Sequence, residues 1–258
     1  MYQELLNNIQ RYLNQQKDLY GDSIIIDDLY PGDVSDIENK MKKNKKNINE
    51  IKIVEDSLFA DNYEEWYKCD DIISLKSKIS DCQKCSLGKT RINFVFGVGN
   101  PNADIMFIGE APGADEDEQG EPFVGKAGQL LNKILQAIQL KREDVFIANI
   151  LKCRPPDNRD PLPTEVEKCE PYLIKQIELI KPIMIVCLGR IAAQTLLRTK
   201  DTLSILRSKI HTYHGVPLYV TFHPAELLRN PNWKPAAWED FKKIKSDYEN
   251  NPLKKFKK

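Results

Sequence analysis

The chain lacks the features of membrane-spanning, secreted and strongly charged proteins. Lys plus Arg and Asp plus Glu both total 38 among 258 residues, so no net charge favours a nucleic-acid partner over the whole surface. The longest apolar run, residues 183–188, is far too short to cross a bilayer. No basic stretch followed by an apolar core opens the chain, so no signal peptide is expected. We therefore expect a cytoplasmic protein without a membrane partner, in which any nucleic-acid surface is a local patch.

Several catalytic and nucleotide-binding motifs are also missing. The sequence has no HExxH zinc motif, no Gly-Lys-Ser/Thr phosphate loop and no Ser–His–Asp pattern. It contains 3 histidines, of which His211 and His214 are predicted to be surface residues. These absences argue against sites of the corresponding kinds.

Six cysteines are present, and in a cytoplasmic protein they are expected to be reduced, catalytic or metal-bound rather than paired in disulfides. The four whose spacing suggests a shared site are Cys82, Cys85, Cys153 and Cys169. Converging thiolates suit tetrahedral zinc or a four-cysteine iron–sulfur cluster, and the spacing does not choose between them. A redox CxxC pair and four incidental buried thiols are the alternatives. Cys187 is predicted to be a core residue, and Cys69 has no predicted partner.

Residues 1–66 differ in composition from the rest of the chain. Apolar residues at helical spacing predict a short helix near residues 5–13, and residues 39–52 consist mostly of Lys and Asn. Those lysines suit a DNA-tracking tail or a solvated linker, and the linker is favoured because charge runs are usually disordered. We predict an N-terminal extension over 1–66, a compact domain over 67–250 and a basic tail over 251–258.

Within the compact domain, four segments have continuous rather than alternating hydrophobicity, as in parallel strands covered on both faces. These predicted strands are residues 103–109, 144–151, 182–189 and 217–224. Helical patterns lie between them, at residues 126–140, 164–180 and 190–199. Thr164 and Glu167 have the spacing of a capping box for the second helix. The alternation predicts an α/β fold, a three-layer α/β/α sandwich with a central four-stranded, mainly parallel sheet.

One stretch, residues 108–131, has the order strand, glycine-rich turn, acidic loop, aromatic residue and helix. Ligands of open α/β sheets bind beyond the carboxyl ends of the strands, where this turn and loop would lie. Five acidic side chains between residues 115 and 121 disfavour a phosphate ligand. The stretch therefore predicts a pocket for a small, flat ligand that is not strongly anionic, with Phe123 as its stacking surface.

Other strand ends carry polar residues that could join this pocket. Asn149 lies in an apolar run and needs a hydrogen-bond partner, either the backbone or the edge of a ligand. His223 lies at the end of the fourth predicted strand, before Pro224, and a capping or core role is the alternative to a site role. Glu110 adds a carboxylate from the glycine-rich turn. With Phe123 they form a set that suits a flat heterocycle read along its edge.

Four features occur in order between about residue 70 and residue 248. They are GEAPGADEDEQGEPFVGKAGQLL, the four-cysteine spacing, ANILKCRPPDNR and HPAELLR. This combination closely resembles the type-4, iron–sulfur uracil-DNA glycosylases, although the resemblance does not cover residues 1–66. It implies hydrolysis of the N-glycosidic bond of deoxyuridine flipped out of DNA, which releases uracil and leaves an abasic site for base-excision repair.

The resemblance also implies roles for individual residues. A structural [4Fe–4S] cluster would be ligated by Cys82, Cys85, Cys153 and Cys169. Uracil would be bound by Gly109, Glu110, Ala111, Phe123, Asn149 and His223. Among these, Phe123 would stack on the base, Asn149 would read its edge and His223 would meet its O2. Glu116 would lie beside the pocket, where it is expected to help exclude the methyl group of thymine.

A local basic face is expected to contact DNA. Its candidate residues are Lys89, Arg91, Arg154, Arg159 and Arg229. Leu228 beside Arg229 pairs an apolar wedge with a cation, which suits entry into a nucleic-acid groove, although the same residues also resemble the start of a helix.

Two departures from related enzymes affect the expected mechanism. Related monofunctional glycosylases have an Asp where this chain has Ala111, so Glu110 and His223 are the candidate catalytic residues. Some relatives trap the sugar through a histidine near the second strand, and residues 155–165 contain none. Irreversible trapping is therefore not expected. We expect a monofunctional DNA glycosylase that is a monomer and acts on single- or double-stranded DNA. The alternative is a non-catalytic module that binds uracil or DNA and tethers a replication or repair partner.

Overall fold

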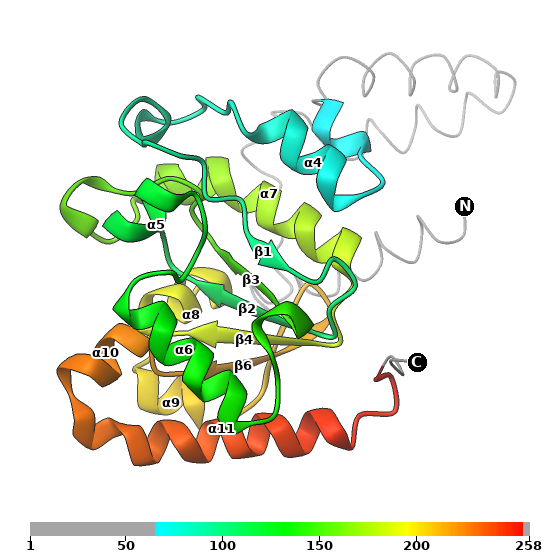
Figure 1. Ribbon diagram of the computed structural model, residues 1–258, viewed down its shortest axis with the longest axis vertical. Helices are drawn as coiled ribbons and strands as arrows, with labels where there is room; N and C mark the ends of the chain where they lie inside the picture. Colours follow the sequence, from blue (N-terminus) through cyan, green and yellow to red (C-terminus); the bar gives the residue numbers. More distant parts are fainter. Residues whose placement is uncertain (1–64, 255–258) are drawn as a thin grey trace, which may run out of the picture. The chain divides into compact units, whose positions relative to one another are not determined.

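The four continuously apolar segments form the parallel centre of a six-stranded sheet in the computed structural model, which describes residues 65–254 (Figure 1). The parallel strands are β2 (Ile105–Gly109), β3 (Phe146–Asn149), β4 (Met184–Leu188) and β6 (Val216–Thr221). Every residue of β2, β3 and β4 is buried, as continuous apolar segments require in a sheet covered on both faces. The sequence prediction of an α/β fold with a mainly parallel sheet is confirmed.

Two short edge strands extend the sheet beyond the predicted four. Strand β1 (Val98–Gly99) pairs antiparallel with β3, and β5 (His211–Tyr213) pairs antiparallel with β6. The full strand order is β1-β3-β2-β4-β6-β5. The sequence did not reveal these strands because segments of two and three residues carry no recognisable hydrophobic period.

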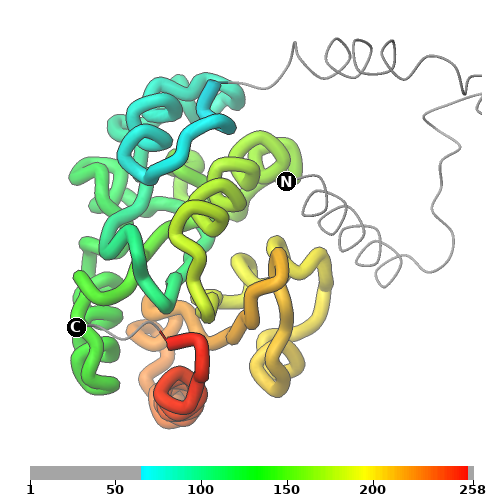
Figure 2. Tube along the Cα trace, turned by 90° about the vertical axis from the view of Figure 1, so that its right-hand side faces the viewer, coloured from blue at the N-terminus to red at the C-terminus, as the bar shows by residue number. Residues whose placement is uncertain are grey.

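Helices cover both faces of the sheet. One layer contains α4 (Ile72–Ile79), α7 (Pro163–Ile180), α8 (Arg190–Leu197) and α9 (Leu203–Arg207). The other contains α6 (Lys126–Ala137) and α11 (Lys234–Glu249). Alternate residues of β2 divide between the layers, since Met106 and Ile108 face the first and Ile105 and Phe107 the second. Figure 2 shows α4 beside α7 and, below them, α11 seen along its axis.

Two local predictions were wrong. The acidic loop after the glycine-rich turn is a short helix, α5 (Ala114–Gln119), which ends at Gly120 with φ 75°. Helix α7 begins at Pro163, so the side chain that reaches back to its N-terminus is Glu165, and Thr164 and Glu167 do not form the capping box. The remaining elements are α10 (Pro224–Arg229) and the 3₁₀ turns η1 (Glu65–Lys68), η2 (Ser86–Lys89), η3 (Arg142–Asp144), η4 (Pro156–Asn158) and η5 (Pro231–Trp233).

The predicted helix and Lys/Asn-rich linker of the N-terminal extension lie outside the described residues. Trp66, assigned to the extension from the sequence, is 8% exposed and packs edge-on against Tyr172 of α7, with 4.8 Å between ring centroids. Within residues 65–254, no helix is long and apolar enough to cross a membrane.

A half-buried ion pair fastens α9 and α11 to the sheet. Asp240 of α11 accepts hydrogen bonds from the Arg207 guanidinium at 2.7 and 2.9 Å and from the Thr221 hydroxyl of β6 at 2.7 Å. Asp240→Ala would leave Arg207 without its counter-charge, so we expect the free energy of unfolding to fall by roughly 2–4 kcal/mol. Urea unfolding of the full chain measures this change.

The matched control is Glu239→Ala on the same helix, because the carboxylate of Glu239 pairs with Lys242 in solvent. This variant should stay within about 0.5 kcal/mol of the wild type. Equal effects of the two substitutions would contradict the proposed contribution of the buried pair.

Candidate active site

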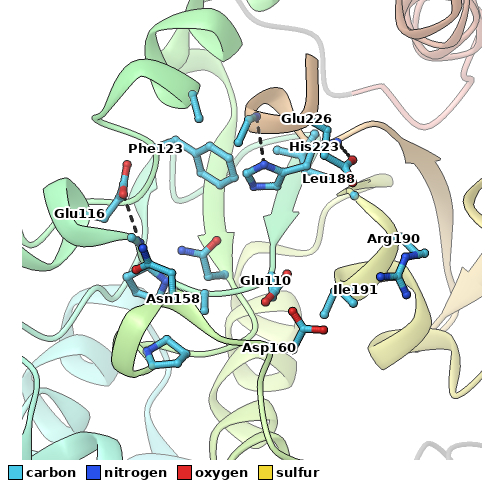
Figure 3. Close-up of a pocket in the computed structure, with 18 of the residues that line it drawn as sticks. Glu110, Glu116, Phe123, Asn158, Asp160, Leu188, Arg190, Ile191, His223 and Glu226 are labelled. Carbon is cyan, nitrogen blue, oxygen red and sulfur yellow. Dashed lines mark hydrogen bonds between the residues drawn. The ribbon is translucent and has the colours of Figure 1, made fainter. Parts of the chain in front are cut away.

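The carboxyl ends of the parallel strands open into a cavity of about 440 Å³, within the usual range for small-ligand sites. Its walls come from the turn after β2, the loop around Phe123, the end of β3, residues 188–191 after β4 and the start of α10. Figure 3 shows Phe123 and His223 together on one side of the cavity, with Glu110 and Asp160 across from them. The predicted base contacts that line it are Glu110, Ala111, Phe123, Asn149 and His223.

Gly109 and Asn149 are register partners at the ends of β2 and β3. Asn149 is 2% exposed, and its Oδ1 atom has no hydrogen-bond partner within residues 65–254. A Cβ atom on Gly109 would lie 2.4 Å from that oxygen and 2.7 Å from the Phe123 ring, so glycine keeps the space between them open. A buried acceptor without a partner is costly. The arrangement therefore indicates a ligand that offers a hydrogen-bond donor to Asn149.

Phe123 is 5% exposed and has a left-handed backbone with φ 53°, a conformation that an aromatic residue adopts only where its surroundings hold it. Arg142 donates to the Phe123 carbonyl oxygen at 3.2 Å. Gly128 of α6 packs so closely below this loop that a Cβ atom would lie 1.7 Å from the same oxygen. The glycine in the helix and the arginine after it thus hold the aromatic ring at the cavity wall.

Glu116 lines the cavity from α5, but its carboxylate is occupied by the protein. It accepts hydrogen bonds from three backbone N–H groups, those of Gly113 at 3.2 Å, Val124 at 2.9 Å and Gly125 at 3.0 Å. This side chain therefore joins the glycine-rich turn to the Phe123 loop. The predicted part of Glu116 in excluding thymine stays a prediction.

His223 both caps a helix and lines the cavity, so the two interpretations drawn from the sequence hold together. Its Nδ1 atom accepts a hydrogen bond from the Ala225 N–H at 3.1 Å, which puts the proton of the neutral ring on Nε2. Burial, with a contribution from Arg229, lowers the pKa of His223 to about 4. The ring lies 5.5 Å from that of Phe123, centroid to centroid. At neutral pH His223 is thus an uncharged Nε2–H donor.

Glu110 has the opposite electrostatic character. Burial raises the pKa of its carboxyl group to about 7; Asp160 and Glu226 add to this, and Arg190 opposes it. A carboxyl group that changes charge near neutral pH, beside a cavity, is a candidate general base.

The four predicted ligand cysteines do not line the cavity and lie in a separate group. Cys82 and Cys85 lie between α4 and η2, Cys153 follows β3, and Cys169 belongs to α7. The fold brings them near one another, since Cys82 and Cys85 influence the pKa of Cys153 electrostatically, and Cys82 and Cys153 that of Cys169. Polar hydrogens face the sulfurs: Tyr172 Oη–H donates to Cys82 Sγ at 3.2 Å, and the Lys152 N–H to Cys169 Sγ at 3.3 Å.

All six cysteines are free thiols, and Cys187 is fully buried in β4, in accordance with its predicted core role. Cys69, half-buried, packs against the same core. No three His, Cys, Asp or Glu side chains among residues 65–254 form a group that could hold a single metal ion.

The predicted DNA contacts have different surroundings. Arg229 lines the cavity mouth, and Leu228 beside it is 42% exposed. Arg154 donates to the Asn158 side chain at 2.8 Å, and Arg159 pairs with Glu165 at 2.6 Å. Arg91 does not line the cavity, because its guanidinium binds the Ser80 and Cys82 carbonyl oxygens and Cys153 Sγ. The guanidinium of Arg91 is thus bonded within and beside the cysteine group. DNA contact by Arg91, Arg154, Leu228 and Arg229 stays a prediction.

Comparisons with known proteins agree with this geometry. A family model of the uracil DNA glycosylase superfamily matches residues 96–242. A type-4 uracil-DNA glycosylase of Archaeoglobus fulgidus is 50% identical over 183 residues, which cover 68% of this chain and 90% of that protein. The chain belongs to the type-4 uracil-DNA glycosylases. Proteins of the same name from Pyrobaculum aerophilum and Saccharolobus solfataricus are 46% and 43% identical, covering 67% and 71% of this chain and 90% and 89% of their own.

This membership confirms the resemblance drawn from the sequence. Some residues that line the glycosylase pocket were not predicted from the sequence. Asn158 and Asp160 line it from the loop after β3, and Arg190 and Ile191 line it from the start of α8. Arg190 could have been found with the rule that located Asn149 and His223, because it lies two residues after the end of β4. The loop residues carried no such signal.

The raised pKa of Glu110 predicts a pH-dependent cost in stability. Between its ordinary value of 4.5 and about 7 the folded state binds more protons at this group than the unfolded state, so its contribution to stability falls as the pH rises. Glu110→Gln removes the ionisable group. Thermal unfolding should show the variant more stable than the wild type at pH 8, with the difference gone by pH 4.5. A difference that does not change with pH would contradict the shifted pKa.

Proposed function

We propose that this protein is a monofunctional uracil-DNA glycosylase that acts on flipped-out deoxyuridine in single- or double-stranded DNA. It would release uracil and leave an abasic site, the first step of base-excision repair. The observation that carries the proposal is the buried, unpartnered Oδ1 atom of Asn149, which faces the slot kept open by Gly109. The type-4 uracil-DNA glycosylases to which the chain is similar support the same substrate.

Asn149 would read the edge of the base. Its Oδ1 would accept from uracil N3–H, and its amide group would donate to O4. Cytosine presents an acceptor at N3 and a donor at C4, so both contacts would fail and leave buried polar groups unpaired. Sites built in this way discriminate by roughly 10⁴-fold or more. Phe123 would stack on the face of the base.

His223 would stabilise the departing base. As the bond between sugar C1′ and uracil N1 breaks, negative charge develops on uracil and positive charge on the sugar. The neutral Nε2–H of His223 would donate to uracil O2, where part of that negative charge collects. A donor of this kind, held in place before the reaction, lowers a barrier by about 3 kcal/mol. The low pKa of His223 keeps the ring neutral, so it acts as a hydrogen-bond donor rather than as a proton donor.

Glu110 would position the attacking water. In its ionised form, present above a pH of about 7, the carboxylate can orient a water molecule toward C1′ and accept its proton. The new bond joins the water oxygen to C1′, and the electrons of the broken bond leave with uracil. Ala111 offers no carboxylate for this role, which is why we assign it to Glu110.

Glu116 would help to exclude thymine through the loop that it holds. Its three backbone contacts join the glycine-rich turn to the segment around Phe123, and this fixes the wall beside the base. We propose that the wall leaves no room for a C5 methyl group. Arg229, which lines the cavity, and its neighbour Leu228 would contact the DNA flanking the flipped nucleotide, as would Arg154, next to the lining residue Pro155.

We also propose that Cys82, Cys85, Cys153 and Cys169 hold a [4Fe–4S] cluster. The donor set fits, because it is all sulfur and receives hydrogen bonds from Tyr172, Arg91 and the Lys152 backbone. A zinc ion would draw all four sulfurs to about 2.3 Å from one centre. A [4Fe–4S] cluster instead binds each of its four thiolates through a separate iron, so the four sulfurs need not meet at one centre. Bound there, the cluster would supply a structural cross-link between α4, the segment after β3 and α7.

The function is tested by uracil release from DNA that contains a single deoxyuridine. We expect wild-type activity, and we expect His223→Ala to lower kcat by roughly 100-fold with little change in DNA affinity, because its donor acts mainly in the transition state. His211→Ala is the matched control, since His211 lies on the edge strand β5 outside the cavity. A wild-type protein that binds uracil-containing DNA tightly but releases no base would instead be the non-catalytic module.

The cofactor is tested by the metal content of protein purified without oxygen. We expect a coloured protein with about four iron and four sulfide ions per chain. Cys169→Ser should lower this content, whereas Cys69→Ser, which changes a cysteine outside the set, should not. A colourless protein with one zinc ion per chain would rule out the cluster.

A further inference from the structure

Lys152 is a fully buried lysine between the base pocket and the cysteine group, and the mechanism above gives its side chain no role. It is 0% exposed. Its Nζ atom donates to the Asn149 carbonyl oxygen at 2.8 Å and to Gln176 Oε1 at 2.7 Å. Its backbone N–H donates to Cys169 Sγ at 3.3 Å. One residue therefore contacts both the base-reading strand end and a proposed cluster ligand.

The ammonium group has no carboxylate partner within residues 65–254, since both its acceptors are neutral. Taking a cation out of water in this way is expensive unless a negative charge lies nearby. Two proposed cluster ligands lie beside this lysine: Cys153 is the next residue in the chain, and Cys169 Sγ accepts from the Lys152 backbone N–H at 3.3 Å. Cysteines bound to a metal are thiolates, and four of them give the bound cluster a net negative charge. The cluster would thus provide the missing counter-charge.

Gln176 links the same lysine to the helix that carries Cys169. It is fully buried in α7, and its amide group donates to the Phe96 carbonyl oxygen at 2.9 Å. Lys152 Nζ therefore lies between two fixed acceptors, one on α7 and the other the Asn149 carbonyl oxygen. Movement of this ammonium group would shift the peptide that sets the direction of the Asn149 side chain.

We propose that Lys152 is a positioning residue that couples the cysteine site to uracil recognition. The negative charge of the cluster holds its ammonium group in the interior, and the ammonium group holds the Asn149 peptide so that Oδ1 faces the pocket. This inference rests on the proposed function and assigns a second task to the cluster: it orients the base-reading residue electrostatically as well as linking chain segments.

The test is Lys152→Met in the full, cluster-loaded chain, because methionine keeps the length of the side chain and removes its charge and donors. Lys175→Met is the matched control. Lys175 lies on α7, pairs with Glu178 at 3.5 Å and does not line the pocket. The first measurement is the rate at which a chelator removes iron, followed by loss of visible absorbance. The second is affinity for DNA carrying 2′-fluoro-deoxyuridine, which resists cleavage, relative to the same DNA carrying deoxycytidine, the base that the Asn149 contacts reject.

We expect Lys152→Met to lose iron roughly 10–100-fold faster and to lose about tenfold of its preference for uracil over cytosine, since changes around metal ligands commonly have effects of this size. Its affinity for DNA without uracil should equal that of Lys175→Met. If Lys152→Met does not fold, Gln176→Met keeps the charge and removes one acceptor, so it should reduce uracil preference while it retains iron.

Unchanged uracil preference in both Lys152→Met and Gln176→Met would overturn the coupling. Unchanged iron release in Lys152→Met would overturn the role of the cluster as counter-charge. Failure of the proposed function is distinguishable, because it would appear in the wild type as a lack of uracil release, before any variant is compared.

Discussion

The pairing of Gly109 with Asn149 at the ends of two parallel strands is the constraint on which the site depends. It places a residue without a side chain opposite a residue with a carboxamide, so a slot opens between them at the edge of the sheet. A shift of one residue in either strand would turn Asn149 to the opposite face and close the slot. Both strands are buried on both faces and apolar throughout, so their hydrophobic pattern alone does not set this register.

Around the slot, the side chains that hold the walls also shape the chemistry. Glu116 accepts a hydrogen bond from the Val124 backbone N–H, and Arg142 donates to the Phe123 carbonyl oxygen. These contacts hold Phe123 at the wall in a backbone conformation that is unfavourable for an aromatic residue. Burial then acts in opposite directions on the two titratable groups. It raises the pKa of Glu110 to about 7 and lowers that of His223 to about 4. One desolvated cavity therefore supplies both a candidate base and a neutral donor.

The cysteine group and the pocket are close in the sequence as well as in the fold. Asn149 ends β3, and Lys152 and Cys153 follow within one short segment. Lys152 turns back to bind the carbonyl oxygen of Asn149, while Cys153 lies with the other cysteines. In the coupling that we propose, this arrangement would let a bound cluster influence Asn149 without itself contacting the base.

The sequence by itself determined the parallel strands, because their apolar runs have only one stable environment, between two helical layers. It also pointed to Asn149 and His223, polar residues at the ends of such strands, and to Phe123, the aromatic residue in the loop before α6. Tertiary structure alone decided the hydrogen-bond partners of the Glu116, Arg91 and Lys152 side chains. Each of these side chains bonds to at least one group that lies in another segment of the chain. Tertiary structure alone also added Asp160 to the pocket and the two short edge strands to the sheet. Hydrophobic periodicity records which surfaces are buried, whereas the direction and partners of a polar side chain depend on the packing of the whole fold.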